Sequence, residues 1–171
     1  MDKSQVCWKY RKLQSTTFFK GMFHGVVHKI LKNRGDEKVW TIAMAKKLSE
    51  VWGQIGKPHV ITVNLKEHPL CIINVYMPSD NSNRDEQYKD ILSQLEEIID
   101  KFQCQYQILL CGDFNVSLHR DNRPRDKCLQ QFMESNGMKL VNGYPTKSTF
   151  YHHNQKSTSQ IDYIMHKYTE K

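Results

Sequence analysis

The sequence lacks the features that mark membrane and secreted proteins. No stretch approaches the roughly 20 apolar residues that a membrane-spanning helix needs, and the first residues lack the basic-then-apolar layout of a secretion signal. The five cysteines are odd in number and never form a CxxC pair, and Cys71 and Cys111 lie in apolar runs. We therefore expect reduced thiols, no zinc site, no membrane partner, and an intracellular location in the nucleus or cytoplasm.

Acidic residues are scarce at the N-terminal end. Residues 1–50 carry 11 Lys and Arg against 4 Asp and Glu, whereas residues 51–171 carry 14 of each, so the whole net charge of +7 comes from the first part. A basic segment can bind phosphate backbones of any sequence, and it can equally be a solvated tail or helix face. Charge alone leaves both interpretations open.

The chain of 171 residues is long enough for one domain with a substantial core. Residues 1–38 mix basic and aromatic residues without a sustained period, so this basic N-terminal segment has no assigned fold. From residue 39 the pattern becomes regular, and we expect a single partial domain over residues 39–171. There are no internal repeats.

Strand and helix patterns alternate along this second part. β-rich runs predict a hairpin, helical spacing of apolar residues predicts two helices, and Gly137 is a typical helix stop. We expect Ser82 to cap the longer helix. The order predicts an α/β fold with helices packed on sheets. The expected strands are 59–65, 69–76, 106–111, 148–152 and 160–165, with an apolar run at 39–45, and the expected helices are 83–102 and 124–136.

The most informative segment is residues 107–115, where an apolar strand ends in Gly112-Asp113-Phe114-Asn115. In an extended segment Asp113 and Asn115 would share a face, and Phe114 would turn into the core. The same residues are typical of a simple turn, because Asp and Asn side chains bond to the nearby backbone.

Three such polar strand ends occur in a fixed order. Together, over roughly residues 39–166, they resemble the endonuclease/exonuclease/phosphatase superfamily, and most closely the endonuclease domain of non-LTR retrotransposons, which is similar to apurinic-site endonucleases. The motifs are Asn74-Val75-Tyr76-Met77-Pro78, Gly112-Asp113-Phe114-Asn115, and Ser159-Gln160-Ile161-Asp162-Tyr163-Ile164, with Ser148-Thr149-Phe150 before the last.

The resemblance implies an incomplete four-layered α/β sandwich of the DNase I-like type that cleaves phosphodiesters with Mg²⁺. By that resemblance Asp113 orients or deprotonates the attacking water, Asn115 holds a non-bridging phosphate oxygen, and Tyr76 donates its hydroxyl toward the phosphate. Asp162 matches the carboxylate that orients a phosphate-polarising histidine in the family, a role that fits histidine chemistry.

Other parts of the family pattern are absent. We find no counterpart of the upstream asparagine or of the metal-ligating glutamate, and Asn33, Glu37 and Glu50 lie in unsuitable surroundings. The metal ligands stay unassigned, with Asp113 and Asn115 as the nearest candidates. The adjacent Ser-Asp-His of the last family strand is missing, so the chain resembles a domain truncated at both ends.

His166 is a poor substitute for the missing histidine, because it lies only four residues beyond Asp162 on the same expected strand. We therefore expect a Mg²⁺-dependent DNA endonuclease domain of retrotransposon origin. As this fragment, the domain is expected to be weak or inactive, and the resemblance leaves open whether it still binds Mg²⁺. The alternatives are a non-catalytic basic nucleic-acid-binding module and a phosphoesterase acting on a small phosphoester.

Overall fold

The computed structural model of the chain describes residues 56–64, 69–79, 84–120, 123–141, 148–151 and 157–167. The chain divides into two compact units, one of residues 1–49 and 148–159 and one of residues 50–147 and 160–171. All four predicted site residues belong to the second unit. The predicted boundary at residue 38 and the apolar run at 39–45 lie outside the described residues.

A mixed five-stranded sheet forms the frame of the second unit, in the order β1-β2-β3-β7-β4. The first two strands form the predicted antiparallel hairpin, and β2 is buried on both faces as expected. β3 runs parallel to β2 and antiparallel to β7, which also pairs with β4. The strands are β1 (His59–Val63), β2 (Leu70–Tyr76), β3 (Gln107–Asp113), β4 (Lys139–Leu140) and β7 (Asp162–Lys167).

Helix α3 (Asp85–Phe102) provides the crossover that two parallel neighbouring strands require. It begins two residues later than predicted, and the predicted Ser82 cap is wrong. Arg84 is the N-cap, and it makes no side-chain capping bond. Acidic Asp85 and Glu86 in the first turn stabilise this end through the helix dipole instead.

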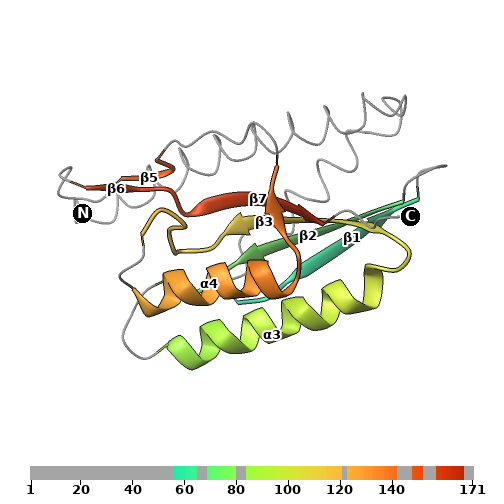
Figure 1. Cartoon of the computed structure of the whole chain (residues 1–171), viewed down its shortest axis with the longest axis horizontal. Helices are drawn as coiled ribbons and strands as arrows, with labels where there is room; N and C mark the ends of the chain where they lie inside the picture. Colours follow the sequence, from blue (N-terminus) through green and yellow to red (C-terminus); the bar gives the residue numbers. More distant parts are fainter. Residues whose placement is uncertain are drawn as a thin grey trace, which may run out of the picture. The chain divides into compact units, whose positions relative to one another are not determined.

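Helix α4 (Pro124–Ser135) confirms the second predicted helix. Proline occupies its first turn, where its missing N–H is tolerated, and Gly137 follows the helix with φ of 61°. Figure 1 shows α3 and α4 side by side on one face of the sheet.

Residues that alternate along the strands pack against these helices and form the hydrophobic core of the unit. The opposite face of the three central strands carries another set of side chains, of which Ile72, Leu109 and Ile164 are fully buried. Tyr76, Asp113 and Asp162 belong to that second set by their positions in the strands. The core cluster contains, from the strands, Cys71, Ile73, Val75, Ile108, Leu110, Tyr163 and Met165, and from the helices, Tyr88, Ile91, Leu92, Leu95, Ile99, Leu129 and Phe132.

The strand expected at 148–152 does not pair with the one that follows residue 160. Instead β5 (Phe150–Tyr151) pairs antiparallel with β6 (Thr158–Ser159) in a separate two-stranded sheet within the first unit. The strand expected at 148–152 thus corresponds to β5, and its partner is β6. The chain then continues into β7, which joins the large sheet.

Candidate functional site

Three predicted site residues lie in one row across the sheet. Tyr76 on β2 is the register partner of Asp113 on β3, and Asp113 is the register partner of Asp162 on β7. Residues that face each other on neighbouring strands project from the same face of a sheet, with Cα atoms about 5 Å apart. The fold therefore brings a phenol and two carboxylates together from segments far apart in the sequence.

The row forms because β3 runs two residues further than its apolar stretch predicts. Gly112 makes this possible, since a Cβ atom there would lie 1.9 Å from the carbonyl oxygen of Val75. Its φ of 153° also favours glycine. A glycine immediately before Asp113 thus keeps β3 close to β2 at the position where the carboxylate is presented.

The pKa of the Tyr76 phenol is affected by both carboxylates. Burial raises its pKa, and the negative charges of Asp113 and then Asp162 raise it further. Asp162 is buried and Asp113 is partly buried, so their charges act on Tyr76 through little water. Because an ordinary tyrosine has a pKa of about 10, Tyr76 is neutral at neutral pH in any case, and its hydroxyl can serve as a hydrogen-bond donor.

Asn115 reaches the row by a turn and not along an extended strand. Its φ of 53° is left-handed, so the expected extended segment through Asn115 is wrong. Its backbone N–H donates to Oδ1 of Asp113 at 2.9 Å, and its side-chain Nδ2 donates to the carbonyl oxygen of Met77 at 2.7 Å. The turn interpretation is therefore confirmed, the turn places Asn115 beside Asp113, and Phe114 is buried in the core as predicted.

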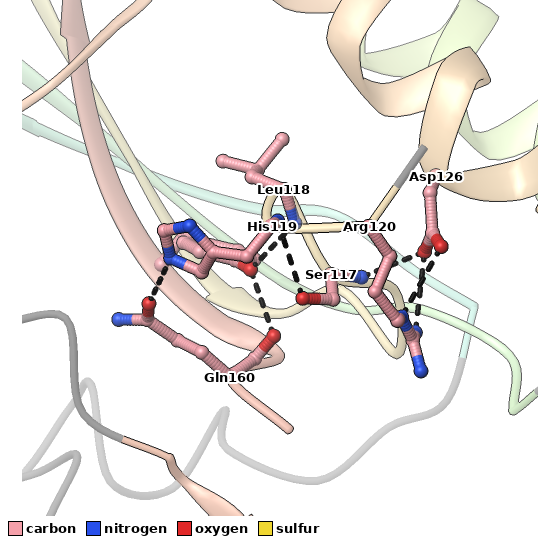
Figure 2. A network of polar contacts seen from close by, with 7 residues as sticks. Ser117, Leu118, His119, Arg120, Asp126 and Gln160 are labelled. Atoms are coloured by element: carbon pink, nitrogen blue, oxygen red, sulfur yellow. Dashed lines mark hydrogen bonds and ion pairs between the residues drawn. The ribbon is translucent and has the colours of Figure 1, made fainter. Parts of the chain in front are cut away.

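The loop after Asn115 is held by residues that sequence reasoning missed. The buried hydroxyl of Tyr163 accepts from the N–H of Leu118 at 2.9 Å and donates to the carbonyl oxygen of Gln160 at 2.7 Å. Figure 2 shows the ring of His119 beside Gln160, with 2.7 Å between His119 Nε2 and Gln160 Oε1. The sequence offered one signal for this role of Tyr163, because Tyr163 directly follows the predicted site residue Asp162.

His166 lies away from the row. It is the register partner of Leu109, whereas Asp162 faces Asp113, four residues further along β3. Four residues of strand span about 13 Å, so the imidazole cannot be the direct partner of the Asp162 carboxylate. Burial, and then the charge of Lys139, lower the pKa of His166.

Only part of a metal-binding set lies within the described residues. Asp113, Asp162 and the Asn115 carboxamide offer oxygen ligands of the kind that Mg²⁺ prefers, but no cluster of three or more His, Cys, Asp or Glu occurs in the part of the chain that the structure describes. Asn33, Glu37 and Glu50 fall outside it. No helix of the described ranges is long and apolar enough to cross a membrane.

The class of fold follows from solved structures. The endonuclease domain of TRAS1, a telomere-specific non-LTR retrotransposon, matches with a TM-score of 0.52 at 15% identity, over 63% of this chain and 49% of that chain. An endonuclease/exonuclease/phosphatase family protein from Leptotrichia buccalis gives a TM-score of 0.46 at 17% identity, over 64% and 40%. The chain spans half or less of the length of both structures, and its α/β fold is of the DNase I-like type.

The family follows from the sequence itself. Residues 70–170, more than half of the chain, match the endonuclease-reverse transcriptase family model, and the chain belongs to that family within the endonuclease/exonuclease/phosphatase superfamily. No curated protein matches the chain. The predicted resemblance and fold class are thereby confirmed.

Proposed function

We propose that the chain carries the phosphodiester-cleaving site of a divalent-metal-dependent DNA endonuclease. The observation that carries this proposal is the row of Tyr76, Asp113 and Asp162 beside Asn115, in a chain of the endonuclease-reverse transcriptase family. We assign the activity to the segment 39–171, with 1–38 as a basic segment.

Each side chain has a role that its surroundings favour. Asp113 orients the attacking water and accepts its proton, because a partly buried carboxylate is a competent acceptor. Tyr76, which is protonated at neutral pH, donates to a phosphate oxygen. Asn115 uses one N–H on Met77, and its second N–H donates to a non-bridging oxygen.

Asp162 acts through Tyr76 in this chain. In the family its counterpart orients a histidine, but His166 is too far along the strand for that role. The charge of Asp162 instead disfavours ionisation of the Tyr76 phenol. In this proposal Asp162 contributes to the electrostatic surroundings of Tyr76, whose phenol is protonated at neutral pH already at its ordinary pKa.

Mg²⁺ fits this site as a partly hydrated ion. It needs only one or two carboxylates because it retains several of its waters, and Asp113 and Asp162 supply two such groups. When bound, the ion would neutralise charge that develops on the phosphate oxygens.

DNA is the substrate that charge and family support. The surplus of positive charge lies entirely in residues 1–50, and it would attract a polyanion much more strongly than a small phosphoester. TRAS1, which shares the fold, is a non-LTR retrotransposon with an endonuclease domain.

The test is nicking of supercoiled plasmid by the purified chain with and without Mg²⁺, beside Asp113→Ala. We expect weak, metal-dependent nicking that falls by roughly 100-fold or more in the variant, because one electrostatic group in a catalytic site is typically worth about 3 kcal/mol. Glu97→Ala, an exposed carboxylate on α3, is the matched control and should nick at the normal rate. Absence of nicking by a folded, Mg²⁺-supplied sample would reject the proposal.

A second candidate function is binding of nucleic acid without catalysis. The concentration of basic residues in the first 50 positions favours it. In that case the affinity for duplex DNA would fall steeply with salt and would not change in Asp113→Ala, and no nicking would accompany it. Fluorescence anisotropy at several salt concentrations separates the two functions.

A further inference from the structure

The first turn of α4 contains two adjacent charged residues that are almost completely buried. Arg125 is 5% exposed and Asp126 is 0% exposed. Charged side chains are rarely buried in this way, and apolar side chains of similar volume are often at least as stabilising. Their contacts therefore have to explain their presence.

Asp126 holds the loop that follows β3. Its Oδ1 accepts the backbone N–H of Ser117 at 2.8 Å, and its carboxylate pairs with the guanidinium of Arg120, whose Nε lies 3.3 Å from Oδ2. Figure 2 shows this carboxylate between Ser117 and Arg120, at the start of the helix. The loop after Asn115 is thus held against α4 by this hydrogen bond and this ion pair.

Arg125 holds the segment that follows β2. Its Nη1 donates to the carbonyl oxygens of Ser79 at 3.0 Å and Pro78 at 3.3 Å, and its Nε donates to Asp85 on α3. The guanidinium also lies 5.3 Å from the ring centre of buried Tyr88. One side chain thereby joins both helices to the end of β2.

The segment after β2 and the loop after β3 are hydrogen-bonded to each other at the candidate site. Nδ2 of Asn115 donates to the carbonyl oxygen of Met77 at 2.7 Å, and the N–H of Met77 donates to the carbonyl oxygen of Asp113 at 2.8 Å. Asn115 is left-handed, a conformation that asparagine tolerates better than most residues, and these bonds fix its side chain in the turn. Arg125 and Asp126, which are adjacent in the first turn of α4, hold the two segments on either side of this contact.

We propose that Arg125 and Asp126 are positioning residues of the site, Arg125 for the segment after β2 and Asp126 for the loop after β3. This inference rests on the proposed function for its effect on cleavage. Neither residue belongs to the row of Tyr76, Asp113 and Asp162. Their contribution is to hold Asn115 and the Met77 carbonyl in register, and small displacements of such groups reduce turnover strongly.

The test compares Asp126→Ala with Asp126→Asn in the full chain, labelled with ¹⁵N. Asparagine keeps an acceptor oxygen for the Ser117 N–H, whereas alanine removes it. Glu134→Ala, an exposed carboxylate on the same helix, is the matched control. The measurements are hydrogen exchange at the Ser117 amide, the side-chain amide signals of Asn115, and kcat and KM for plasmid nicking.

We expect Asp126→Ala to exchange at Ser117 at least about tenfold faster, to shift the Asn115 side-chain signals, and to lower kcat by roughly 10- to 100-fold with little change in KM. Asp126→Asn should restore most of the exchange protection and most of kcat. Arg125→Lys should shift the Asn115 signals too, because one ammonium cannot replace the guanidinium fork.

Unchanged Asn115 signals in folded Asp126→Ala would overturn the proposal, and so would an Asp126→Asn variant as impaired as alanine. If alanine prevents folding, Arg125→Lys decides, because unchanged Asn115 signals in that folded variant would overturn the proposal as well. A wild-type chain that nicks no DNA would reject the proposed function alone, because exchange at Ser117 and the Asn115 signals still judge the positioning.

Discussion

Replacing Gly112 with alanine should disrupt both the sheet and the site. The added Cβ would lie 1.9 Å from the Val75 carbonyl oxygen, where an ordinary contact is about 3.3 Å. To relieve this contact, β2 and β3 would have to move apart by about 1 Å or more. One or two ladder hydrogen bonds at about 1 kcal/mol each, together with 1–3 kcal/mol for the unfavourable φ, give a loss of roughly 2–5 kcal/mol.

Thermal unfolding measures this loss directly. For a chain of this size, 1 kcal/mol changes Tm by about 2–4 °C, so Gly112→Ala should melt roughly 4 to 20 °C below the parent. Gly137→Ala is the matched control, since Gly137 also has a positive φ but its Cβ would meet only Lys167 Cε at 3.9 Å. That variant should lose only about 1–2 kcal/mol.

Comparing the two variants therefore separates the energetic cost of the close approach at Gly112 from the cost of a positive φ. If Gly112→Ala and Gly137→Ala melt at the same temperature, the close approach of β2 and β3 has no energetic weight and our account of the row is wrong. If Gly112→Ala alone melts early, the same displacement should also part Tyr76 from Asp113. The pKa of Tyr76 would then fall.

Elements with a strong local pattern could be predicted from the sequence. The apolar stripe that becomes α3 follows helical spacing, and β2 is apolar on both faces from Leu70 to Ile73. Pro124 and Gly137 mark the ends of α4 through their own backbone preferences. Each of these signals depends on neighbouring residues alone.

Features that depend on distant partners could not be predicted. The side chain of Asn115 is held by Met77, 38 positions earlier, and the buried carboxylate of Asp126 is bonded by Ser117 and ion-paired with Arg120. Sequence reasoning places charged residues on the surface because burial without partners is costly. The pairing of β5 with β6 likewise reflects a choice among strands that local composition does not reveal.

Two titrations test the electrostatics of the sheet. Asp113→Asn should lower the pKa of Tyr76, because it removes a negative charge beside the phenol while the effect of burial remains; NMR of labelled tyrosine rings measures it, and an unmoved pKa would contradict the row. For His166, burial and Lys139 lower the folded pKa below the ordinary 6.5, so the unfolded chain binds more protons between those two values. Stability should therefore rise with pH through that window and be lost as the pH falls. His166→Gln should flatten the pH dependence of the urea unfolding free energy between about pH 5 and 7, with a residual slope from His59, whose pKa is also lowered by burial. An undiminished slope in that variant would place the proton-linked loss of stability elsewhere in the chain.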